Sequence, residues 1–396
     1  MGVKVYDAIV VGLGPGGAVA ATDLGRAGLS VLGLEWKALP RYKVCGGGLS
    51  ARIDRLLEPD YHHIIEKTIH AVQFRFAGKD SFQIASAEPI AYMVMRDRFD
   101  AYLVHKAREA GIHIHEDERV DAVSEYSDWV EVRTGRGRYR AQVVVGADGA
   151  SSTVARSLFP EGRGRSMSGL EGEAVVGQRP VPLDAGAIVV DIGIVPGGYA
   201  WVFPKEGRLS IGVAEFLSRG RSPKGIYDRF VKNEPAMDGC AVPAGLGHPL
   251  PLYDGVLSEG RRLSTGRVLL IGDAAHLVDP LFGEGIYYAV LSGRMAARSI
   301  IEWAHGTAAD LRAYDERVAR DIYPEFRVAA RMAWTVYTFP QVSHRMIRRR
   351  PGIMQLYAGV LKGQETYRSF YAKAKEEAKS SFAYFLRDAC LSAFSR

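Results

Sequence analysis

One of the three cysteines in the chain stands directly before three consecutive glycines. Cys45 is followed by Gly46, Gly47 and Gly48 in the stretch VCGGGLS. Most free cysteines are small buried apolar residues. Flanking glycines have no packing use beside such a residue, however, and they let a backbone approach a ligand closely. We therefore interpret this stretch as part of a ligand site.

A second glycine cluster lies near the amino terminus, between elements that must position it. Apolar residues at 6–11 predict a buried parallel strand, a helical pattern follows the glycines, and a second strand ends at Glu35. In this pattern Gly12 permits a tight turn, Gly14 leaves room for a pyrophosphate, and Gly17 lets helix and strand pack closely. The acid at the end of the second strand is placed to bind a ribose hydroxyl. The predicted dinucleotide contacts are Gly12, Gly14, Gly16, Gly17 and Glu35.

Two later strand patterns end in acidic turns. The sequence QVVVGADG covers Gln142–Gly149, and RVLLIGDAAH covers Arg267–His276 and continues as LVDPLFGEGIYYAV. A single aspartate at such a turn more commonly caps a helix. In order with the first glycine cluster, these motifs resemble the glutathione-reductase-like FAD superfamily, in the branch that contains aromatic hydroxylases, flavin halogenases and geranylgeranyl reductases.

This resemblance implies an FAD site assembled from distant parts of the chain. Asp148 and Gly149 match the motif beside the pyrophosphate, and Gly272 and Asp273 match the motif near the ribityl chain. Arg96, in MRDRFD, resembles the arginine that approaches FAD from the middle of the chain. The last motif opens a helix whose amides and dipole are expected to face the flavin N1–O2 edge. Its implied FAD contacts are Pro280, Gly283, Gly285 and Ile286.

Three phrases narrow the resemblance to the geranylgeranyl reductase family, which saturates isolated C=C bonds of polyprenyl chains. They are PRYKVCGGGLS, YAWVFPK at Tyr199–Lys205, and PLFGEGI. In that family a cysteine followed by glycines lies near the flavin, which implies that Gly46 and Gly47 contact FAD and that the Cys45 thiol faces the substrate. Halogenases carry a similar tryptophan motif, but this chain has Tyr199 and Phe203 in the corresponding places, which favours the reductase.

The alternation in YAWVFPK predicts a strand with its large aromatic side chains on one face. Such a face is most often plain core. Its place between the second and third FAD motifs instead favours a substrate wall, and aromatic rings suit an isoprenoid chain without polar groups. The resemblance therefore implies Cys45, Tyr199 and Trp201 as catalytic residues, with Phe203 as a further substrate contact.

The expected reaction is hydride transfer from N5 of reduced FAD to a polyprenyl chain carried by a lipid, quinone or chlorophyll-type substrate. The aromatic wall is expected to stabilise positive charge developing at the tertiary carbon by cation–π attraction. The sequence shows no second nicotinamide-type motif, so the external reductant is expected to be NADPH, bound transiently, or ferredoxin. Two alternatives stay open: an FAD-dependent monooxygenase of an aromatic or polyketide substrate, and a non-catalytic FAD-bound redox or scaffold protein.

The formal net charge of +6 is partly local, because four arginines lie between residues 345 and 350. Such a run is usually a solvated face, and its functional alternative is contact with an anionic membrane surface. No nucleic-acid-binding pattern accompanies it. Three scattered cysteines and the lack of a signal-peptide pattern predict a cytoplasmic protein with, at most, peripheral membrane contact. We expect no metal site, because His113 and His115 lack a third ligand.

Together these patterns predict an α/β plus β protein. A discontinuous Rossmann-like FAD-binding domain is expected at residues 1–72, 92–160 and 262–305. An antiparallel-sheet substrate-binding domain is expected at 73–91 and 161–261. Helical periodicity predicts a helical C-terminal region at 306–396. We expect this region to cover the substrate site, with a position on the membrane as the alternative.

Overall fold

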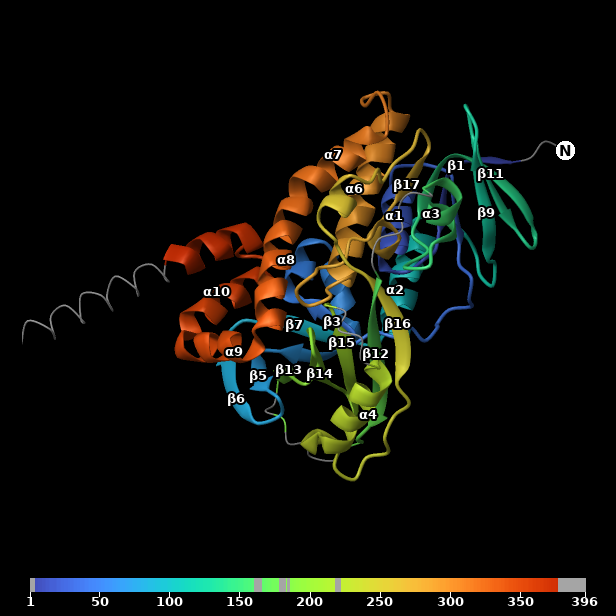
Figure 1. Ribbon diagram of the computed structural model, residues 1–396. Coiled ribbons are helices and arrows are strands. Elements are labelled where there is room, and N and C mark those ends of the chain that lie inside the picture. Colours follow the sequence, from blue (N-terminus) through green and yellow to red (C-terminus); the bar gives the residue numbers. More distant parts are fainter. Residues whose placement is uncertain (1–3, 160–165, 178–182, 184–185, 218–221, 377–396) are drawn as a thin grey trace, which may run out of the picture.

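Figure 1 shows the computed structural model, which describes residues 4–159, 166–177, 183, 186–217 and 222–376. These residues form three sheets with helices around them, and a group of helices from the last third of the chain lies to one side. The predicted α/β plus β architecture is confirmed. The predicted C-terminal region is described only as far as residue 376.

The first sheet has a parallel centre that is buried on both faces. In spatial order its strands are β8 His113–His115, β2 Val31–Leu34, β1 Val5–Val11, β11 Gly137–Gly146, β10 Val130–Thr134 and β9 Val120–Glu125, with β17 Val268–Leu270 pairing with the end of β11. β1 is parallel to β2 and β11, and β17 is parallel to β11. Near-continuous Val, Ile and Leu runs suit strands covered on both sides.

Helices cover this sheet and complete the predicted strand–helix–strand unit. α1 Pro15–Arg26 crosses over from β1 to β2 and packs on α2 Arg96–Glu109 and α6 Ile286–Ala304, while α3 Thr153–Leu158 packs on β9. α1 and α6 approach at backbone distance, since a Cβ at Gly16 would lie 2.5 Å from the Ala289 carbonyl oxygen. A Cβ at Gly293 would lie 2.4 Å from the carbonyl oxygen of Gly16. Glycine is therefore required on both helices.

The second sheet carries the predicted aromatic strand. Its order is β16 Leu246–Pro251, β12 Ser166–Val175, β15 Arg208–Glu215, β14 Gly198–Lys205, β13 Ala187–Ile192, β5 Ala71–Phe76 and β6 Asp80–Ala85. All neighbours are antiparallel except β13 and β5. α4 Pro223–Asn233 covers one face through Ile226, Tyr227 and Phe230, and the opposite face looks toward the first sheet and the C-terminal helices.

A small third sheet joins the two larger ones. Its strands are β3 Gly48–Ser50, β7 Ala91–Val94 and β4 Ile65–Ile69. β3 begins at the last glycine of the VCGGGLS stretch and pairs with β7, which leads directly into Arg96 at the start of α2. The glycine stretch is thus held by a sheet and not by a free loop.

The last third of the described chain is helical. Its helices are α7 Arg312–Asp321, α8 Tyr323–Thr338, α9 Pro340–Arg349 and α10 Pro351–Leu361, and a short α5 Val256–Glu259 precedes β17. α9 packs on β5 and α10 packs on β6, so these two helices lie at one end of the second sheet, whereas α7 packs on α6 (Figure 1). Among the described residues, no helix combines the length and the apolar character needed to cross a bilayer. The domain boundaries given above stay a prediction.

We expect Gly16→Ala to lower the free energy of unfolding by about 1–3 kcal/mol, because its Cβ would collide with the backbone of α6. The matched control is Gly225→Ala in the first turn of α4, where a Cβ would meet no atom within 4 Å. That change should be neutral or stabilising by less than about 1 kcal/mol. Urea denaturation measures both, and equal effects of the two changes would contradict the close helix contact.

Candidate active site

The first glycine cluster forms a cradle for an anionic group at the start of α1. Gly12 has φ +90°, and a Cβ there would lie 2.5 Å from the carbonyl oxygen of Ala147. Beside Gly14, in contrast, the nearest atom is an Arg41 nitrogen 4.0 Å from the Cβ position. No side chain caps the helix, and no acidic residue lies in its first turn. The free amides and the helix dipole therefore favour a phosphate group at this position.

Glu35 is buried at the end of β2 and holds this cradle in shape. Its Oε2 accepts a hydrogen bond from the backbone N–H of Leu13 at 2.9 Å, and Oε1 accepts one from Arg41 Nε at 3.0 Å. Arg41 also donates to Asp100 at 2.9 Å, so one guanidinium links the segment after β2 to α2. The sequence interpretation missed Arg41, whose only signal is its place six residues after the acid.

The charged groups of Arg96 and Asp148 form hydrogen bonds with other residues of the protein. Arg96 is buried and donates two hydrogen bonds of 2.9 Å to Asp100, the same carboxylate that Arg41 binds. Asp148 accepts hydrogen bonds from Ser152 Oγ and from the backbone N–H of Thr153, at 2.5 and 2.6 Å. Its carboxylate therefore stabilises the start of α3, which is the helix-cap role considered above. Gly149, with φ +76°, leaves open space beside the motif.

The third motif brings a carboxylate to the start of α6. A Cβ at Gly285 would lie 3.4 Å from Asp273 Oδ1, and α6 has neither a side-chain cap nor an acid in its first turn. Burial alone would raise the pKa of Asp273, but His248 and Lys43 outweigh it and hold this pKa below its usual range. Gly272 and Gly283 have positive φ, and Pro280 and Ile286 are buried around the turn.

The two helix starts fit two parts of FAD. The uncapped α1 suits the pyrophosphate, and the uncapped α6 beside Asp273 suits the ribityl and flavin end. When bound, this cofactor supplies redox chemistry that no side chain of the protein can supply.

The glycine stretch lies flat across the aromatic face of the second sheet. A Cβ at Gly46 would be 3.1 Å from the Phe203 ring and 3.3 Å from Trp201 Nε1. A Cβ at Gly47 would be 2.1 Å from the Val94 carbonyl oxygen and 3.2 Å from Lys205 Nζ, and Gly47 has φ +71°. Only glycine fits at Gly47, and a side chain at Gly46 would require the Phe203 and Trp201 rings to shift. Cys45 is half-buried at the edge of this contact, and its Sγ accepts the N–H of Gly47 at 3.4 Å.

Tyr199, Trp201 and Phe203 share one face of β14, as the alternation predicts. Tyr199 and Trp201 are buried, with ring centroids 5.9 Å apart, and Trp201 and Phe203 are 6.0 Å apart. The Tyr199 hydroxyl donates to the carbonyl oxygen of Phe282 at 2.7 Å, which ties the aromatic strand to the turn before α6. The structure thus brings the cysteine stretch, the aromatic strand and the third FAD motif together.

Positive groups surround Cys45. Burial, together with the nearby Arg96, lowers the pKa of Lys43 to about 8. Lys43 Nζ lies 2.6 Å from Nε2 of His248 on β16, and that imidazole is 3.9 Å from Asp273. Arg96 interacts with Cys45 as well as with Asp100, and both raise the pKa of its guanidinium against the opposing effect of burial. His248 was not predicted, since nothing in the sequence near it resembles a motif.

A buried acidic cluster lies on the same face of the sheet, beside the aromatic side chains of β14. Glu171 accepts hydrogen bonds from Ser210 Oγ and from the Tyr42 hydroxyl, both at 3.1 Å, and Trp201 Nε1 donates to the same Ser210 at 3.3 Å. Lys205 pairs with Glu173 at 2.5 Å. Burial raises the pKa of Glu171 to about 7, and the neighbouring Glu173 adds to this rise. These acids were also missed by the sequence interpretation.

A second buried network fixes the turn before α6. Arg52, which is 8% exposed, pairs with Glu284 and lies 4.0 Å from the Tyr287 ring centroid. Ser50 donates a hydrogen bond to the same Glu284, so β3 is tied directly to the GEG turn. Asp279 accepts the N–H groups of Leu281 and Phe282, at 2.7 and 2.9 Å, through Oδ1. Burial raises the pKa of Asp279, whose Oδ2 has no hydrogen-bond partner among the described residues.

A shallow apolar pocket continues the aromatic face toward the C-terminal helices. Phe282 contacts Tyr357 of α10, with centroids 5.5 Å apart, and Tyr357 also lines the pocket. The remaining lining comes from β5, β6, the segment after β6 and α10. It comprises Val72, Phe74, Ile84, Ala85, Ser86, Ile90, Met354, Ala358 and Leu361. Packed apolar side chains therefore continue from Tyr199 to the outer strands of the sheet.

The raised pKa of Glu171 predicts a pH-dependent cost in stability. The folded protein holds this proton between about pH 4.5 and 7, where an unfolded chain has lost it, so stability falls as the pH rises through that window. Glu171→Gln removes the titration. We expect the free energy of unfolding of the wild type to decrease relative to the variant by roughly 1–3 kcal/mol between pH 4.5 and 8. Parallel pH profiles of the two proteins would contradict the buried position of this acid.

Comparisons with known proteins agree with this site. A family model described as an FAD binding domain matches residues 5–185 and 259–320, and a model of the geranylgeranyl reductase catalytic domain matches residues 176–247. Digeranylgeranylglycerophospholipid reductase 1 of Methanopyrus kandleri is 32% identical over 350 residues, covering 83% of this chain and 90% of the relative. A chloroplastic geranylgeranyl diphosphate reductase of Nicotiana tabacum is 28% identical, covering 81% of this chain and 72% of the relative.

Solved structures show the same fold. A geranylgeranyl bacteriochlorophyll reductase-like protein of Thermoplasma acidophilum superposes with a TM-score of 0.75 at 23% identity, covering 85% of this chain and 88% of that one. A flavin-dependent brominase superposes with a TM-score of 0.72 at 18% identity, covering 95% of this chain and all of its own. The two structural neighbours share the fold, and the relative from Methanopyrus kandleri shows the family. The chain belongs to the geranylgeranyl reductase family of FAD-binding proteins.

Proposed function

We propose that this protein is an FAD-dependent reductase that saturates isolated C=C bonds of a geranylgeranyl or other polyprenyl chain on a lipid, quinone or chlorophyll-type substrate. One observation carries the proposal: the backbone of Gly46 and Gly47 lies against Trp201, Phe203 and Lys205, so the cysteine–glycine stretch meets the aromatic strand directly. The relatives named above are reductases, so a monooxygenase and a non-catalytic FAD protein are not favoured.

The reaction adds one hydride equivalent and one proton across a C=C bond. Reduced FAD supplies the hydride equivalent. Because an isolated alkene is a poor hydride acceptor, positive charge develops at its more substituted carbon, and the rings of Tyr199 and Trp201 stabilise that charge. When Glu171 is ionised, Glu171 and Glu173 carry two negative charges, and Lys205 neutralises only one of them. Ser210 forms hydrogen bonds with both Glu171 and the Trp201 indole. This cluster favours positive charge in front of the aromatic face.

We assign the proton step to the Cys45 thiol. Its Sγ lies beside the aromatic face, and the surrounding Arg96 and Lys43 stabilise the thiolate that remains after the proton leaves. Lys43, with its lowered pKa and its contact with His248, is placed to return a proton to the sulfur.

The polyprenyl chain is proposed to follow the apolar surface from Tyr199 past Phe282 to the pocket beneath α10. Such a surface suits a substrate that has only hydrocarbon to bind. We propose NADPH or ferredoxin as the external reductant. We also propose that Asp148, Asp273 and Arg96 contact FAD. We also propose a cytoplasmic protein that contacts a membrane from one side.

The decisive test is anaerobic incubation of the FAD-loaded, photoreduced protein with a geranylgeranyl lipid, followed by mass spectrometry. We expect a gain of two hydrogen atoms for each saturated bond, together with reoxidation of the flavin. An oxygen-dependent gain of one oxygen atom without saturation would instead establish a monooxygenase. If the substrate does not reoxidise the flavin at all, the remaining alternative is a non-catalytic FAD-bound protein.

Cys45→Ser tests the proton step in the same assay. The variant should retain FAD, because Gly46 and Gly47 are unchanged, but it should lower the rate of substrate-dependent flavin reoxidation by roughly tenfold or more. Cys240→Ser is the control, since Cys240 packs beside the core cluster under α4, on the far face of the second sheet. A Cys45→Ser protein with wild-type rate and product pattern would remove the thiol from the mechanism.

A further inference from the structure

Exposed apolar side chains gather at one corner of the helical region. Trp334, Phe339, Val342 and Met346 are 57%, 50%, 66% and 46% exposed, and they are four of the thirteen exposed large apolar or aromatic residues in the described chain. The Trp334 and Phe339 rings are 5.9 Å apart, across the junction of α8 and α9. We call these four residues the α8–α9 surface. Their concentration within thirteen consecutive positions distinguishes them from the exposed apolar residues elsewhere.

Packing of α9 on the second sheet fixes the orientation of this surface. Ser343 and His344 are buried, and the His344 ring lies 5.8 and 5.0 Å from the rings of Phe76 and Phe82. In an α-helix, positions 342 and 346 lie one turn apart on the side opposite to 344. Val342 and Met346 therefore point away from the protein while the other side of the same helix is in the core. No described residue covers them.

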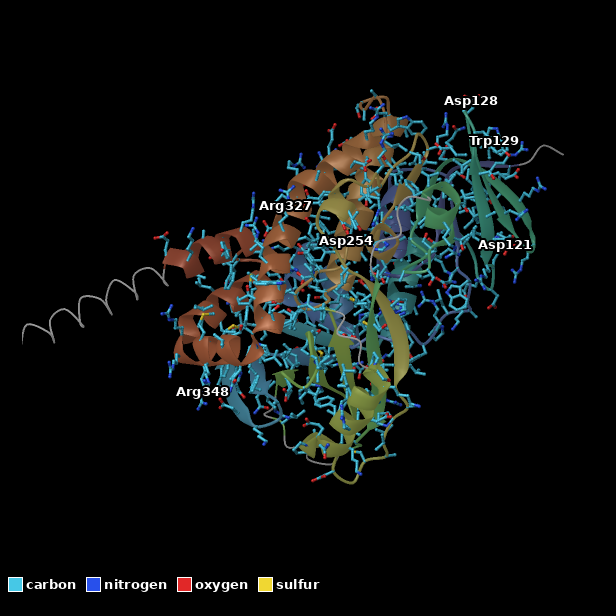
Figure 2. The ribbon with its side chains drawn as sticks, in the orientation of Figure 1. Asp121, Asp128, Trp129, Asp254, Arg327 and Arg348 are labelled. Carbon is cyan, nitrogen blue, oxygen red and sulfur yellow. The ribbon has the colours of Figure 1, made fainter. Side chains whose placement is uncertain are left out.

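The region around this surface is basic and lacks acids. Residues 326–364 contain seven Lys and Arg and no Asp or Glu. Arg345 and Arg349 are exposed on the same side of α9 as Val342, and neither forms an ion pair with any residue in the described part of the chain. Arg348 pairs with Asp80 of β6, and Figure 2 shows it at the outer edge of the molecule beneath α9.

We propose that the α8–α9 surface docks onto an anionic lipid bilayer. Trp334, Phe339, Val342 and Met346 enter the boundary between head groups and acyl chains, and Arg345 and Arg349 bind the anionic head groups. Aromatic and apolar side chains flanked by arginines are the combination that favours such an interface. A second copy is disfavoured as the occupant, because a symmetric contact would place the unpaired arginines against one another.

Docking at this corner has a consequence for substrate entry, which rests on the function proposed above. α10 follows α9 directly and lines the apolar pocket with Met354, Tyr357 and Leu361. A polyprenyl chain leaving the bilayer beside α9 therefore meets the pocket at the neighbouring helix. The same arrangement leaves the head group at the membrane.

Flotation of the full-length, FAD-loaded protein with vesicles tests the docking surface. We use vesicles of equal parts phosphatidylglycerol and phosphatidylcholine, compared with phosphatidylcholine alone, and neither contains a prenyl substrate. The wild type should bind the anionic vesicles, with binding weakened by salt. Val342→Ser combined with Met346→Ser should reduce binding by about tenfold or more, and Arg345→Gln combined with Arg349→Gln should do the same. The matched control, Val242→Ser with Leu257→Ser, changes two exposed apolar residues elsewhere and should bind as the wild type does.

Several results would overturn the docking surface. They are wild-type binding by both double variants, equal binding of the wild type to neutral vesicles, or a wild-type dimer that Val342→Ser with Met346→Ser converts to a monomer. Activity on a detergent-solubilised geranylgeranyl lipid separates this proposal from the proposed function, because the variants should saturate that substrate at the wild-type rate. Absence of saturation by the wild type would refute the reductase activity and leave the vesicle result standing.

Discussion

The architecture of the site depends on the approach of one peptide backbone to the face of a sheet. Residues 42–47 meet the second sheet strand by strand: Lys43 reaches His248 on β16, Tyr42 reaches Glu171 on β12, and Gly46 meets the rings of Trp201 and Phe203 on β14. A side chain at Gly46 or Gly47 would push the two surfaces apart. A Cβ at Gly46 would lie 3.1 Å from the Phe203 ring, and a Cβ at Gly47 would lie 2.1 Å from the Val94 carbonyl oxygen. Since this segment follows the nucleotide-binding strands directly, the contact joins the cofactor site to the aromatic wall.

Burial distributes charge around this contact unevenly. Lys43 and Arg96 lie near Cys45, while Glu171 and Glu173 lie beside the aromatic side chains on the same face of the sheet and are only partly neutralised by Lys205. Each of these groups is costly to bury alone, so each has a partner: Arg96 has Asp100, Lys43 has His248, and Lys205 has Glu173. As a result, the Cys45 thiol lies near positive groups. The aromatic side chains lie beside the negative groups Glu171 and Glu173, on the same sheet.

The turn of the third FAD motif contacts several other parts of the molecule. Its turn presents the start of α6 to the cofactor site, and the same turn is fixed by Arg52 and Ser50 through Glu284. Phe282, in that turn, accepts the Tyr199 hydroxyl and contacts the ring of Tyr357. A displacement of the turn would therefore move the cofactor end of α6, the aromatic strand and the covering helix α10 together.

The sequence by itself determined the features that depend on neighbouring residues. The strand–glycine–helix unit and the alternation of Tyr199, Trp201 and Phe203 follow from local periodicity and from the special backbone of glycine. The two later FAD motifs were identified by their resemblance to known flavoproteins. The tertiary structure alone decided which surfaces meet. Glu171 joins Trp201 because antiparallel register places both opposite Gly212, and His248 reaches Lys43 because β16 pairs with β12. Pairing between distant strands is set by the burial of whole faces, and no short stretch of residues carries that information.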